Sequence, residues 1–473
     1  MKPLVVFLSL PLLLCSLALC PAADPTRPPN ILFLFADDLS YQALGAYGNS
    51  EAQTPNLDKL AKRGATFTHA YNMGSWSPAV CVASRTMLIT GRHVWDANRV
   101  FNKTDKERQQ EVLWPQLLAK AGYDTYFTGK WHIQTDAEKC FRIAKNVRAG
   151  MPKTTKEAYD RPRDNAPDTW SPFDESLGGY WQGGKHWSEV VADDAVDFLN
   201  QAQERPNPFF MYIAFNAPHD PRQSPEEFVK KFPPDKLKVP VSYLPEYPHK
   251  EMMGAGKGLR DEQLAPFPRT EHAVQIHRGE YYALLAHLDV QVGRVLDSLE
   301  KSGQLANTWV FFTADHGLAV GHHGLMGKQN QYDHSVRVPF LVAGPGVTAG
   351  KKIAVPIYLQ DVVPTTLELA KAEKPKHVWF QSVLPLVRGE RETSSYAAIY
   401  GSYLDQQRAI TADGFKLIVY PRGNVQKLFD LQRDPEEMHD LAQDKSHQAT
   451  LEKLNAQLVQ LQLELTDPLM IKK

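Results

Sequence analysis

The chain has 473 residues, of which 43% are hydrophobic and 23% charged, and its formal net charge is −1. This ordinary globular balance excludes a strongly basic protein, so we expect no nucleic-acid partner. The length is sufficient for one large domain and a smaller second domain.

The first 23 residues have the features of a secretory signal peptide: Lys2 precedes an apolar run over 4–19 and a Pro-Ala-Ala exit at 21–23. The run is short for a membrane span, although a retained anchor is the alternative. We therefore expect a secreted or periplasmic protein with no stable membrane partner. Removal of this segment leaves two of the four cysteines, Cys81 and Cys140, so no disulfide framework is predicted.

Residues 24–375 alternate between predicted strands and helices, which is typical of an α/β domain with a mainly parallel central sheet flanked by helices. The strongest strand signals are continuous apolar runs, which indicate strands buried on both faces. Predicted strands cover 31–35, 67–71, 123–127, 208–215, 309–313 and 338–342, and predicted helices cover 54–60, 112–118, 190–199, 279–299 and 361–370.

Polar residues with possible chemistry follow four of these strands. In open α/β sheets, ligands bind at the carboxyl ends of the strands, so we expect these side chains to converge there. Taken singly, each has a structural alternative: a pair of acids can be a helix cap and a solvated carboxylate, and a lone histidine is more often a satisfied core residue. The residues are Asp37, Asp38, Lys130, His132, His219, Asp315 and His316.

The stretch from Ser75 to Arg92 contains Cys81 just before a short apolar helix that we expect to run from Ser84 to a Gly91 stop. A helix N-terminus favours an anion, and Arg85, four residues on, faces the same side. The alternative is a small buried thiol at a helix start.

Two long segments, 134–188 and 220–270, show no clear period and are predicted to be surface excursions near the site. His186 lies at the end of the first segment. A Gly-rich loop at 321–328 contains His322, His323 and Lys328.

Residues 376–473 differ from the preceding segment in their pattern of predicted elements. Short predicted strands at 397–400, 408–411, 415–420 and 427–430 are separated by Asp-Gly and Gly-Asn turns, and a predicted helix follows over 447–464. This pattern predicts a small C-terminal subdomain with an antiparallel sheet and a helix.

The pattern C-x-A-x-R at 81–85 resembles the signature of the formylglycine-dependent (type I) sulfatases, with Ala83 where Pro is commonest. The resemblance extends from Pro29 to about residue 465, and in texture it is closest to bacterial carbohydrate sulfatases, with some likeness to iduronate-2-sulfatase. Further motifs that match are Thr-Pro-Asn-Leu-Asp (54–58), Ile-Thr-Gly-Arg (89–92), Thr-Gly-Lys-Trp-His (128–132), Ala-Pro-His (217–219) and Gly-Lys (327–328).

This resemblance implies an alkaline-phosphatase-like fold and a sulfuric ester hydrolase. It also implies that a formylglycine-generating maturation enzyme converts Cys81 to formylglycine (3-oxoalanine), whose hydrate is the nucleophile. One divalent cation is expected at the modified Cys81; three carboxylates favour Ca²⁺ or Mg²⁺, beside which a thiolate would fit poorly. The protein ligands implied by the family are Asp37, Asp38, Asp315 and His316.

The family also implies roles for the other motif residues. Asp315 is expected to take the proton of the attacking hydroxyl, while Arg85 and Lys130 hold the hydrate. His219 or Lys328 is expected to protonate the leaving alcohol. His132 would then take the proton of the second hydroxyl.

We therefore expect an exported sulfatase acting on a sulfated saccharide, with His186, His322 and His323 as candidate substrate-binding residues and His272 as a further polar histidine. Many relatives carry an acid at the position of His322. The first alternative is a phosphodiesterase or phosphonate ester hydrolase with the same nucleophile, because sulfate and phosphate are both tetrahedral. A non-catalytic carbohydrate-binding relative is disfavoured, because no motif position is missing.

Overall fold

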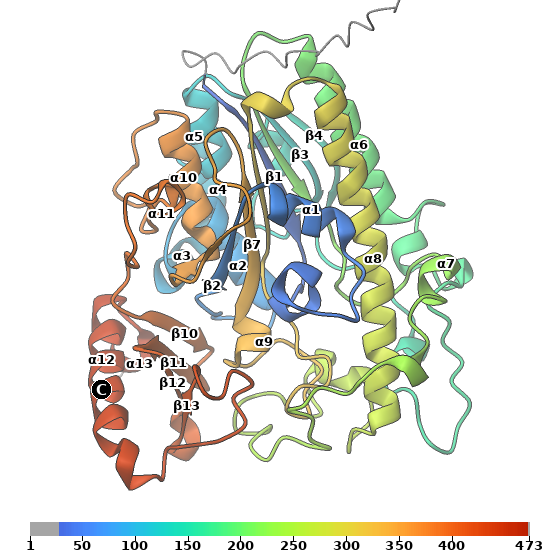
Figure 1. Cartoon of the computed structure of the whole chain (residues 1–473), viewed down its shortest axis with the longest axis vertical. Helices are drawn as coiled ribbons and strands as arrows, with labels where there is room; N and C mark the ends of the chain where they lie inside the picture. Colours follow the sequence, from blue (N-terminus) through green and yellow to red (C-terminus); the bar gives the residue numbers. More distant parts are fainter. Residues whose placement is uncertain (1–27, 472–473) are drawn as a thin grey trace, which may run out of the picture.

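The computed structural model describes residues 28–471 (Figure 1). Within them, a large sheet lies between two groups of helices, and a smaller sheet with its own helix follows near the C-terminus. The predicted signal peptide, residues 1–23, lies outside the described residues.

Over residues 28–471, the large sheet has nine strands in the order β4-β3-β5-β1-β6-β7-β2-β8, with β9 paired to β2. All neighbouring pairs are parallel except those of β7 with β6 and with β2, so the mainly parallel sheet is confirmed. The strands are β1 (Asn30–Ala36), β2 (Ala65–Tyr71), β3 (Asp124–Lys130), β4 (Ile143–Arg148), β5 (Phe209–Ala214), β6 (Thr308–Ala314), β7 (Arg337–Ala343), β8 (Lys351–Ile353) and β9 (Ile357–Tyr358).

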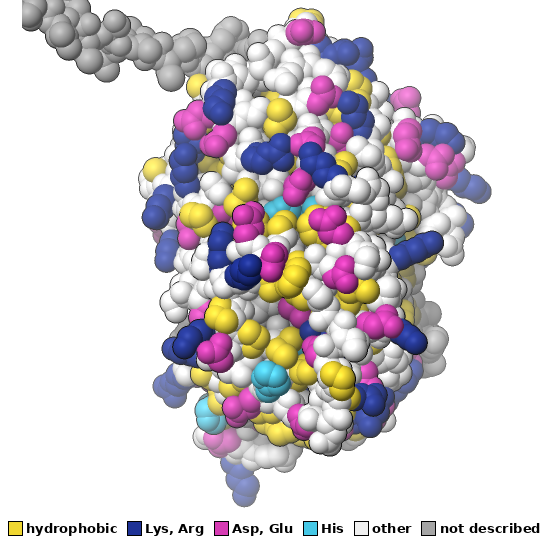
Figure 2. Space-filling view, turned by 90° about the vertical axis from the view of Figure 1, so that its right-hand side faces the viewer, with side chains coloured by type: hydrophobic (Ala, Val, Ile, Leu, Met, Phe, Trp, Pro, Cys, Tyr) yellow, Lys and Arg dark blue, Asp and Glu magenta, His cyan; other side chains and the backbone are white. Residues whose placement is uncertain are grey.

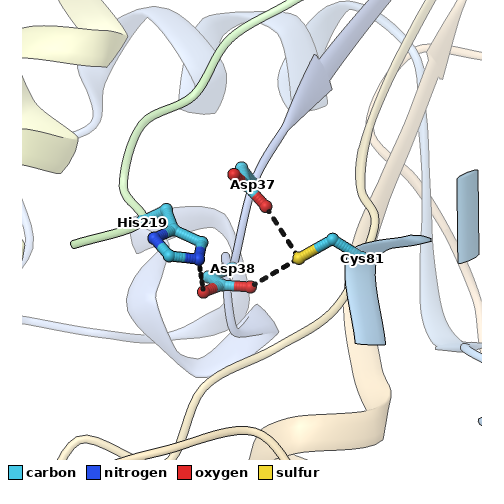
Figure 3. Close-up of side chains that lie close together, drawn as sticks. All are labelled: Asp37, Asp38, Cys81 and His219. Atoms are coloured by element: carbon cyan, nitrogen blue, oxygen red, sulfur yellow. Dashed lines mark hydrogen bonds and ion pairs between the residues drawn. The ribbon is translucent and has the colours of Figure 1, made fainter. Parts of the chain in front are cut away.

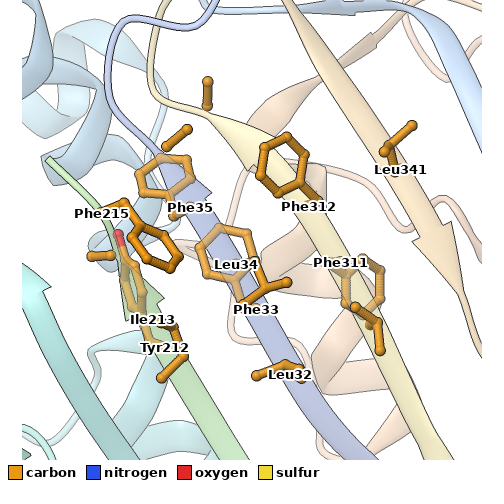
Figure 4. Close-up of a cluster of buried hydrophobic side chains, with 14 of the residues drawn as sticks. Leu32, Phe33, Leu34, Phe35, Tyr212, Ile213, Phe215, Phe311, Phe312 and Leu341 are labelled. Carbon is orange, nitrogen blue, oxygen red and sulfur yellow. The ribbon is translucent and has the colours of Figure 1, made fainter. Parts of the chain in front are cut away.

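The core of the sheet is centred on β1, which pairs with β5 on one side and β6 on the other. Its residues Ile31 to Phe35 are fully buried, and Figure 4 shows the side chains of the three strands in contact. Phe33 and Tyr212 pack edge to face with ring centroids 5.0 Å apart. Since each such buried side chain stabilises the fold by roughly 1.5–3 kcal/mol, the strand end that carries Asp37 rests on a rigid base.

Helices cover both faces of the sheet (Figure 1). On one face lie α1 (Pro55–Arg63), α6 (Trp187–Gln203) and α8 (Glu271–Lys301). On the other lie α2 (Val80–Thr90), α5 (Trp114–Lys120) and α10 (Val362–Leu369). The shorter helices are α3 (Val94–Val100), α4 (Thr104–Gln109), α7 (Glu226–Val229), α9 (Asp333–Val336), α11 (Leu384–Arg388) and α13 (Pro468–Ile471).

The long helix α8 begins at Glu271 rather than near Gly279 as predicted. The Thr270 side chain accepts a hydrogen bond from the Ala273 backbone N–H at 3.1 Å and so caps the helix. The extra turns bury Val274 and His277. Because His277 is polar, it interrupts the apolar stripe from which the start of the helix was predicted.

The C-terminal sheet pairs β10 (Ile399–Tyr403), β11 (Gln407–Ala412), β12 (Phe415–Tyr420) and β13 (Val425–Asp430) in antiparallel order, and α12 (Gln448–Glu464) follows. This sheet and helix were predicted. The first strand contacts the segment before α2: Ser75 N donates to Ser402 O, and Leu404 N donates to Ser75 O, both at 2.8 Å. The C-terminal unit therefore supports the approach to Cys81. The expected boundary at residue 375 stays a prediction.

The surface carries no large patch of one charge on the face shown in Figure 2, where basic and acidic side chains are interspersed. Within residues 28–471, every helix is too short or too polar to cross a lipid bilayer.

Candidate active site

Cys81 is the second residue of α2, which ends at Gly91 with a left-handed φ of 68°. Its thiol is buried and points at the end of β1: Sγ lies 3.2 Å from Asp37 Oδ1 and 3.6 Å from Asp38 Oδ1 (Figure 3). The predicted place of Cys81 at the helix N-terminus is thus confirmed. The structure adds that two carboxylates face it.

Three buried carboxylates converge because β1 and β6 are neighbouring parallel strands. Asp37 and Asp38 follow β1, Asp315 follows β6, and the Asp38 backbone N–H donates to Asp315 Oδ1 at 3.2 Å. Burial raises the pKa of Asp37 and raises that of Asp38 to about 8. Burial would also raise the pKa of Asp315, but Arg85, Lys130 and Lys328 outweigh it and hold that pKa below the ordinary value.

Three basic side chains balance these acids. Lys130, the last residue of β3, is ion-paired with Asp37. Arg85 Nε donates to Asp315 Oδ2 at 2.9 Å and its Nη1 donates to the Lys130 carbonyl at 2.7 Å, while its buried Nη2 has no hydrogen-bond partner among the described residues. Lys328 Nζ lies 2.7 Å from Asp38 Oδ1 and 3.3 Å from Cys81 Sγ.

His219 is held by the residue that follows it. Its Nδ1 lies 2.7 Å from the Asp220 carbonyl oxygen, which can only accept, so Nδ1 carries a proton. Its Nε2 then faces Asp38 Oδ2 at 3.4 Å. Burial, reinforced by Lys328 and Lys130, lowers the pKa of His219, which favours the neutral ring.

His316 and His132 present one free nitrogen each. His316 Nδ1 lies 3.1 Å from the Gly317 carbonyl and must donate to it, which leaves Nε2 as the nitrogen available to a ligand. His132 has a left-handed φ of 58°, so the backbone does not stay extended from Lys130 to His132. Its Nδ1 is buried without a partner among the described residues. Burial lowers the pKa of His132 to about 3, and the positive charge of Lys130 adds to this effect.

Possible metal-ligating atoms of four residues lie within 4.8 Å of one another: Asp37, Asp38, Cys81 and His219. All four were predicted at the site, with Cys81 and the two acids assigned to the metal ion and His219 to the leaving group. Asp315 adjoins this cluster through Asp38 N and Arg85. The sequence could not distinguish His219 from His316 as the histidine closer to the acids.

A cavity of about 210 Å³ opens beside Cys81. The two irregular excursions supply part of its wall, since Met151 comes from the first and Arg260 from the second. Lys130, His132, His219 and Lys328 were predicted site residues and all line it; the other lining residues are Pro78, Ala79, Met151, Leu259, Arg260, Asp261 and Gln329.

Arg260 and Asp261 are site residues that the sequence did not reveal. They lie in a short 3-10 helix, Arg260–Leu264, inside the segment without a clear period. Arg260 forms ion pairs with Asp220 and Asp261, and Gln329 Nε2 donates to Asp261 Oδ2 at 2.9 Å. The only available signal was Asp220 beside His219.

The expected substrate-binding role of His186 is not supported by its position. It is fully buried, its Nδ1 accepts from Ser188 N at 3.1 Å to cap α6, and its Nε2 lies 3.0 Å from the Gln223 carbonyl. Tyr180 stacks on its ring and donates to the His219 carbonyl at 3.1 Å. His186 therefore supports the segment that carries His219 and does not itself line the cavity.

His322 and His323 also lie away from the cavity beside Cys81. His323 has partners on both ring nitrogens: His334 at 3.3 Å and the Glu437 carbonyl at 3.1 Å. His322 lies 2.8 Å from Ser242 Oγ and lines a separate cavity with Glu436. Sequence alone could not show that both rings turn toward the C-terminal half of the protein.

Comparison with known proteins now decides the family. The sulfatase family model matches residues 29–372. The chain belongs to the sulfatase family. A second model, of the C-terminal part of N-sulphoglucosamine sulphohydrolase, matches residues 321–464 of this sulfatase.

Characterised relatives match this sulfatase over most of its length. It is 27% identical to an arylsulfatase of Clostridium perfringens over 463 residues, covering 91% of this chain and 94% of the relative. It is 25% identical to an N-acetylglucosamine-6-O-sulfatase of Bacteroides thetaiotaomicron, covering 92% and 86%. The sulfatase is therefore a sulfuric ester hydrolase, as the motifs predicted.

Solved structures confirm the fold of the sulfatase. BT4656, in complex with its substrate D-glucosamine-2-N,6-O-disulfate, superposes with a TM-score of 0.71 at 21% identity, covering 93% of this chain and 99% of BT4656. A phosphonate monoester hydrolase of Agrobacterium radiobacter has the same TM-score of 0.71 at 20% identity, covering 92% and 96%. The fold is alkaline-phosphatase-like, as expected.

Proposed function

We propose that this sulfatase is exported and hydrolyses sulfate monoesters of a carbohydrate, using formylglycine formed from Cys81 and one divalent cation, Ca²⁺ or Mg²⁺. The single observation that carries the proposal is the contact of Cys81 Sγ with Asp37, Asp38 and Lys328 at the rim of a cavity. The carbohydrate substrate is supported by the relatives, among which are an N-acetylglucosamine-6-O-sulfatase and an ulvan-active sulfatase.

The donor set fits a hard cation. Asp37, Asp38 and Asp315 offer carboxylate oxygens, and His316 offers Nε2 because its Nδ1 donates to a carbonyl. The raised pKa values of Asp37 and Asp38 indicate that the surrounding basic groups do not fully offset burial. These four residues would hold the ion, which would stabilise negative charge on the sulfate oxygens.

Cys81 is poorly suited to act as a thiolate. Burial raises the pKa of its thiol, and Asp315 and Asp37 raise it further. A neutral thiol is a weak nucleophile, since the thiolate is the reactive form. Conversion to formylglycine by a maturation enzyme would replace the sulfur with an aldehyde whose hydrate provides an oxygen nucleophile.

The residues around position 81 are arranged to hold and deprotonate such a group. Lys130 provides hydrogen-bond donors, and so does Nη2 of Arg85, which forms no hydrogen bond within the described residues and lies 3.9 Å from Asp37 Oδ1. Asp315, whose pKa is held low by Arg85, remains a carboxylate and can accept the proton of the attacking hydroxyl. His132, kept neutral by burial, can accept the second proton.

Two groups can supply the proton that the leaving alcohol requires. Lys328 is charged: burial lowers its pKa, but Asp38 and the other neighbouring acidic groups together raise it by more. His219 would donate from Nε2, which carries a proton only when the ring is charged, because its Nδ1 proton is bonded to the Asp220 carbonyl. Both line the cavity beside Cys81, so both are within the region where the ester would lie.

A phosphodiesterase or phosphonate ester hydrolase remains the second candidate, supported by the fold of phosphonate monoester hydrolases from Agrobacterium radiobacter and Silicibacter pomeroyi. The deciding experiment compares 4-nitrophenyl sulfate, bis(4-nitrophenyl) phosphate and 4-nitrophenyl phenylphosphonate with protein coexpressed with a maturation enzyme. We expect the largest kcat/KM on the sulfate and none in Cys81→Ala. A larger kcat/KM on either phosphorus ester would overturn the proposal.

Substrate class and export are tested separately. The enzyme is assayed on a panel of defined sulfated mono- and oligosaccharides, and we expect it to release free sulfate from at least one of them. Fractionation of cells that express the full chain should place the protein outside the cytoplasm, whereas deletion of residues 1–23 should retain it inside.

A further inference from the structure

A second, larger cavity of about 830 Å³ lies beside the Cys81 cavity. The same two excursions form it: Tyr159 and Arg163 come from the first, and Lys257, Gln263 and Phe267 come from the second. None of these side chains has a role in the chemistry described above.

The two cavities share a wall. The 3-10 helix Arg260–Leu264 contributes Arg260 to the Cys81 cavity, and its next residues, Glu262 and Gln263, line the larger one. Tyr159 Oη in the larger cavity lies 3.5 Å from Arg260 Nη1. A ligand that leaves the smaller cavity past Arg260 therefore meets Tyr159 next.

The backbone beneath the larger cavity is fixed. Asp160 N donates to Gln263 O at 2.6 Å, and Arg161 N donates to Leu264 O at 3.1 Å, so the two excursions are hydrogen-bonded to each other. Arg161 is also ion-paired with Glu280 of α8 at 2.7 Å. These contacts connect the cavity to the helical layer of the main domain.

The lining has the chemistry that recognises a sugar chain. The ring of Tyr159 offers an aromatic surface, and so does Phe267, although the Arg269 guanidinium covers one of its faces at 3.6 Å from the ring centroid. The amides of Asn165 and Gln263 can donate to and accept from hydroxyl groups. Lys257 is exposed and forms no salt bridge within the described residues, so it can bind an anion.

Two of the three acidic residues that line this cavity are paired, whereas the third, Asp164, is exposed and forms no salt bridge within the described residues. Glu262 is buried, ion-paired with Arg269 at 2.6 Å, and accepts the backbone N–H of Gly327 at 2.8 Å. Asp160 is ion-paired with Arg163, which remains 61% exposed in its side chain. Arg163 and Lys257 therefore supply exposed donors for a sulfate or carboxylate group of a neighbouring sugar, while Asp164 can accept a hydrogen bond from a hydroxyl group.

Size separates the functions of the two cavities. Pockets that bury a whole small ligand usually measure about 300–1,000 Å³. The cavity beside Cys81, at about 210 Å³, is below that range and suits the sulfated end of a substrate. The second, at about 830 Å³, is within it.

We propose that the larger cavity is a saccharide subsite, which binds the anionic sugar residues next to the one that carries the scissile sulfate. This inference depends on the proposed function in one respect, that the substrate is a carbohydrate ester. It adds that the enzyme distinguishes an oligosaccharide from a single sulfated sugar through Arg163, Lys257 and Gln263.

The kinetic test uses a heparin-derived tetrasaccharide with 6-sulfated glucosamine at its non-reducing end, the matching monosaccharide, and 4-nitrophenyl sulfate. The double variant Arg163→Ala/Lys257→Ala should lower the ratio of kcat/KM on the tetrasaccharide to kcat/KM on the aryl sulfate by about tenfold or more. Gln263→Ala should lower the same ratio by a smaller factor. The matched control is Arg433→Ala, an 87% exposed arginine paired with Asp430 three residues before it, which should leave the ratio unchanged.

A binding test removes the dependence on turnover. Inactive Cys81→Ala protein is titrated calorimetrically with heparin, chondroitin sulfate and carrageenan tetrasaccharides and their sulfated monosaccharides. We expect at least one tetrasaccharide to bind at least tenfold more tightly than its monosaccharide, and the additional Arg163→Ala/Lys257→Ala change to abolish that difference.

Failure of the two proposals would look different. A wild-type enzyme without activity on any sulfate ester contradicts the proposed function, and the titration still decides the subsite. Activity on sulfate esters with no tetrasaccharide preference in any of the three series, or a preference that survives Arg163→Ala/Lys257→Ala, overturns the subsite alone.

Discussion

Lys328 Nζ lies 2.7 and 2.5 Å from the two carboxylate oxygens of Asp38, although 290 residues separate them in the chain. Both side chains are buried, and a buried charge is tolerated only when it is paired. The loop that carries Lys328 is itself held to the C-terminal half, where His323 contacts the Glu437 carbonyl at 3.1 Å. Correct placement of this lysine thus depends on both parts of the protein.

The pair makes a prediction about cation affinity. Lys328 places a positive charge against a proposed metal ligand, so Lys328→Met should bind Ca²⁺ more tightly, by about tenfold, while turning over more slowly. Titration calorimetry on metal-free protein measures the affinity. Lys328→Arg, which keeps the charge, is the control; weaker Ca²⁺ binding by Lys328→Met would show that the lysine does not oppose the ion.

Metal removal should abolish activity. Because the proposed ligands are carboxylates, Ca²⁺ or Mg²⁺ should restore turnover better than Zn²⁺ after chelation. Asp37→Asn and Asp38→Asn should each reduce kcat by at least a hundredfold at matched protein stability. Elemental analysis verifies the occupancy, and full activity in protein shown to be metal-free would contradict the assignment.

Cys81 should lack its thiol in active enzyme. Peptide mass spectrometry after coexpression with a maturation enzyme should find formylglycine at position 81, and the specific activity of different preparations should rise in proportion to the modified fraction. Cys81→Ala should be inactive, and so should Cys81→Ser where no maturation enzyme acts on serine. An unmodified thiol in fully active protein would rule out the mechanism.

The fold was predictable where burial is complete. The runs that became β1, β5 and β6 are continuous and apolar, since they are covered on both faces. The edge strand β4 was missed because its residues are only partly buried, which leaves no apolar pattern. The two- and three-residue strands β9 and β8 are too short to produce any pattern.

The site was predictable where regular strands deliver it. Asp37 directly follows β1 and Lys130 is the last residue of β3, two parallel strands of the same sheet, and the end of a strand is visible in sequence. Arg260 and Asp261 come from an irregular segment whose path depends on tertiary contacts, so no local sequence pattern predicts their place in the site. The surroundings of His186 were not predictable, because sequence shows a histidine near the site but does not show that both its nitrogens are bonded internally.

The folded protein should also show a pH-dependent stability due to Asp289. This residue of α8 caps α1, since its carboxylate accepts the backbone N–H groups of Asn56 at 3.0 Å and Leu57 at 2.8 Å. Burial outweighs these hydrogen bonds and raises the pKa of Asp289 to about 6. The folded state therefore binds this proton more strongly than the unfolded state.

The sign follows from that difference. The contribution of Asp289 to the free energy of unfolding is fully present below its ordinary pKa of 3.8 and falls as the pH rises to about 6, by about 3 kcal/mol in total. Asp289→Asn should remove this fall from the pH profile measured by urea unfolding. Asp297→Asn, at an exposed position of the same helix, is the control; an identical pH slope in wild type and Asp289→Asn would refute the shift.

Replacement of His219 and replacement of His132 should slow different steps of the reaction. Loss of the proton donor matters most when the leaving alcohol is a poor one, so His219→Ala should impair saccharide sulfates more than 4-nitrophenyl sulfate. His132→Ala should instead slow the step after ester cleavage. Rapid-quench measurement should then show a burst of alcohol close to one equivalent of enzyme, followed by a slow phase. If the two variants lose the same activity on both substrates and neither shows a burst, these roles are wrong.

Lys328 complicates the assignment of the proton donor, because its charged amine lies on the same Asp38 carboxylate that His219 faces. If either group can protonate the alcohol, each single variant retains part of the activity. The double variant His219→Ala/Lys328→Ala should then be worse than either single variant on a saccharide sulfate. That additional deficit should shrink on 4-nitrophenyl sulfate, which needs little acid assistance. A deficit of equal size on both substrates would show instead that the two residues position the ester, because positioning affects every leaving group alike.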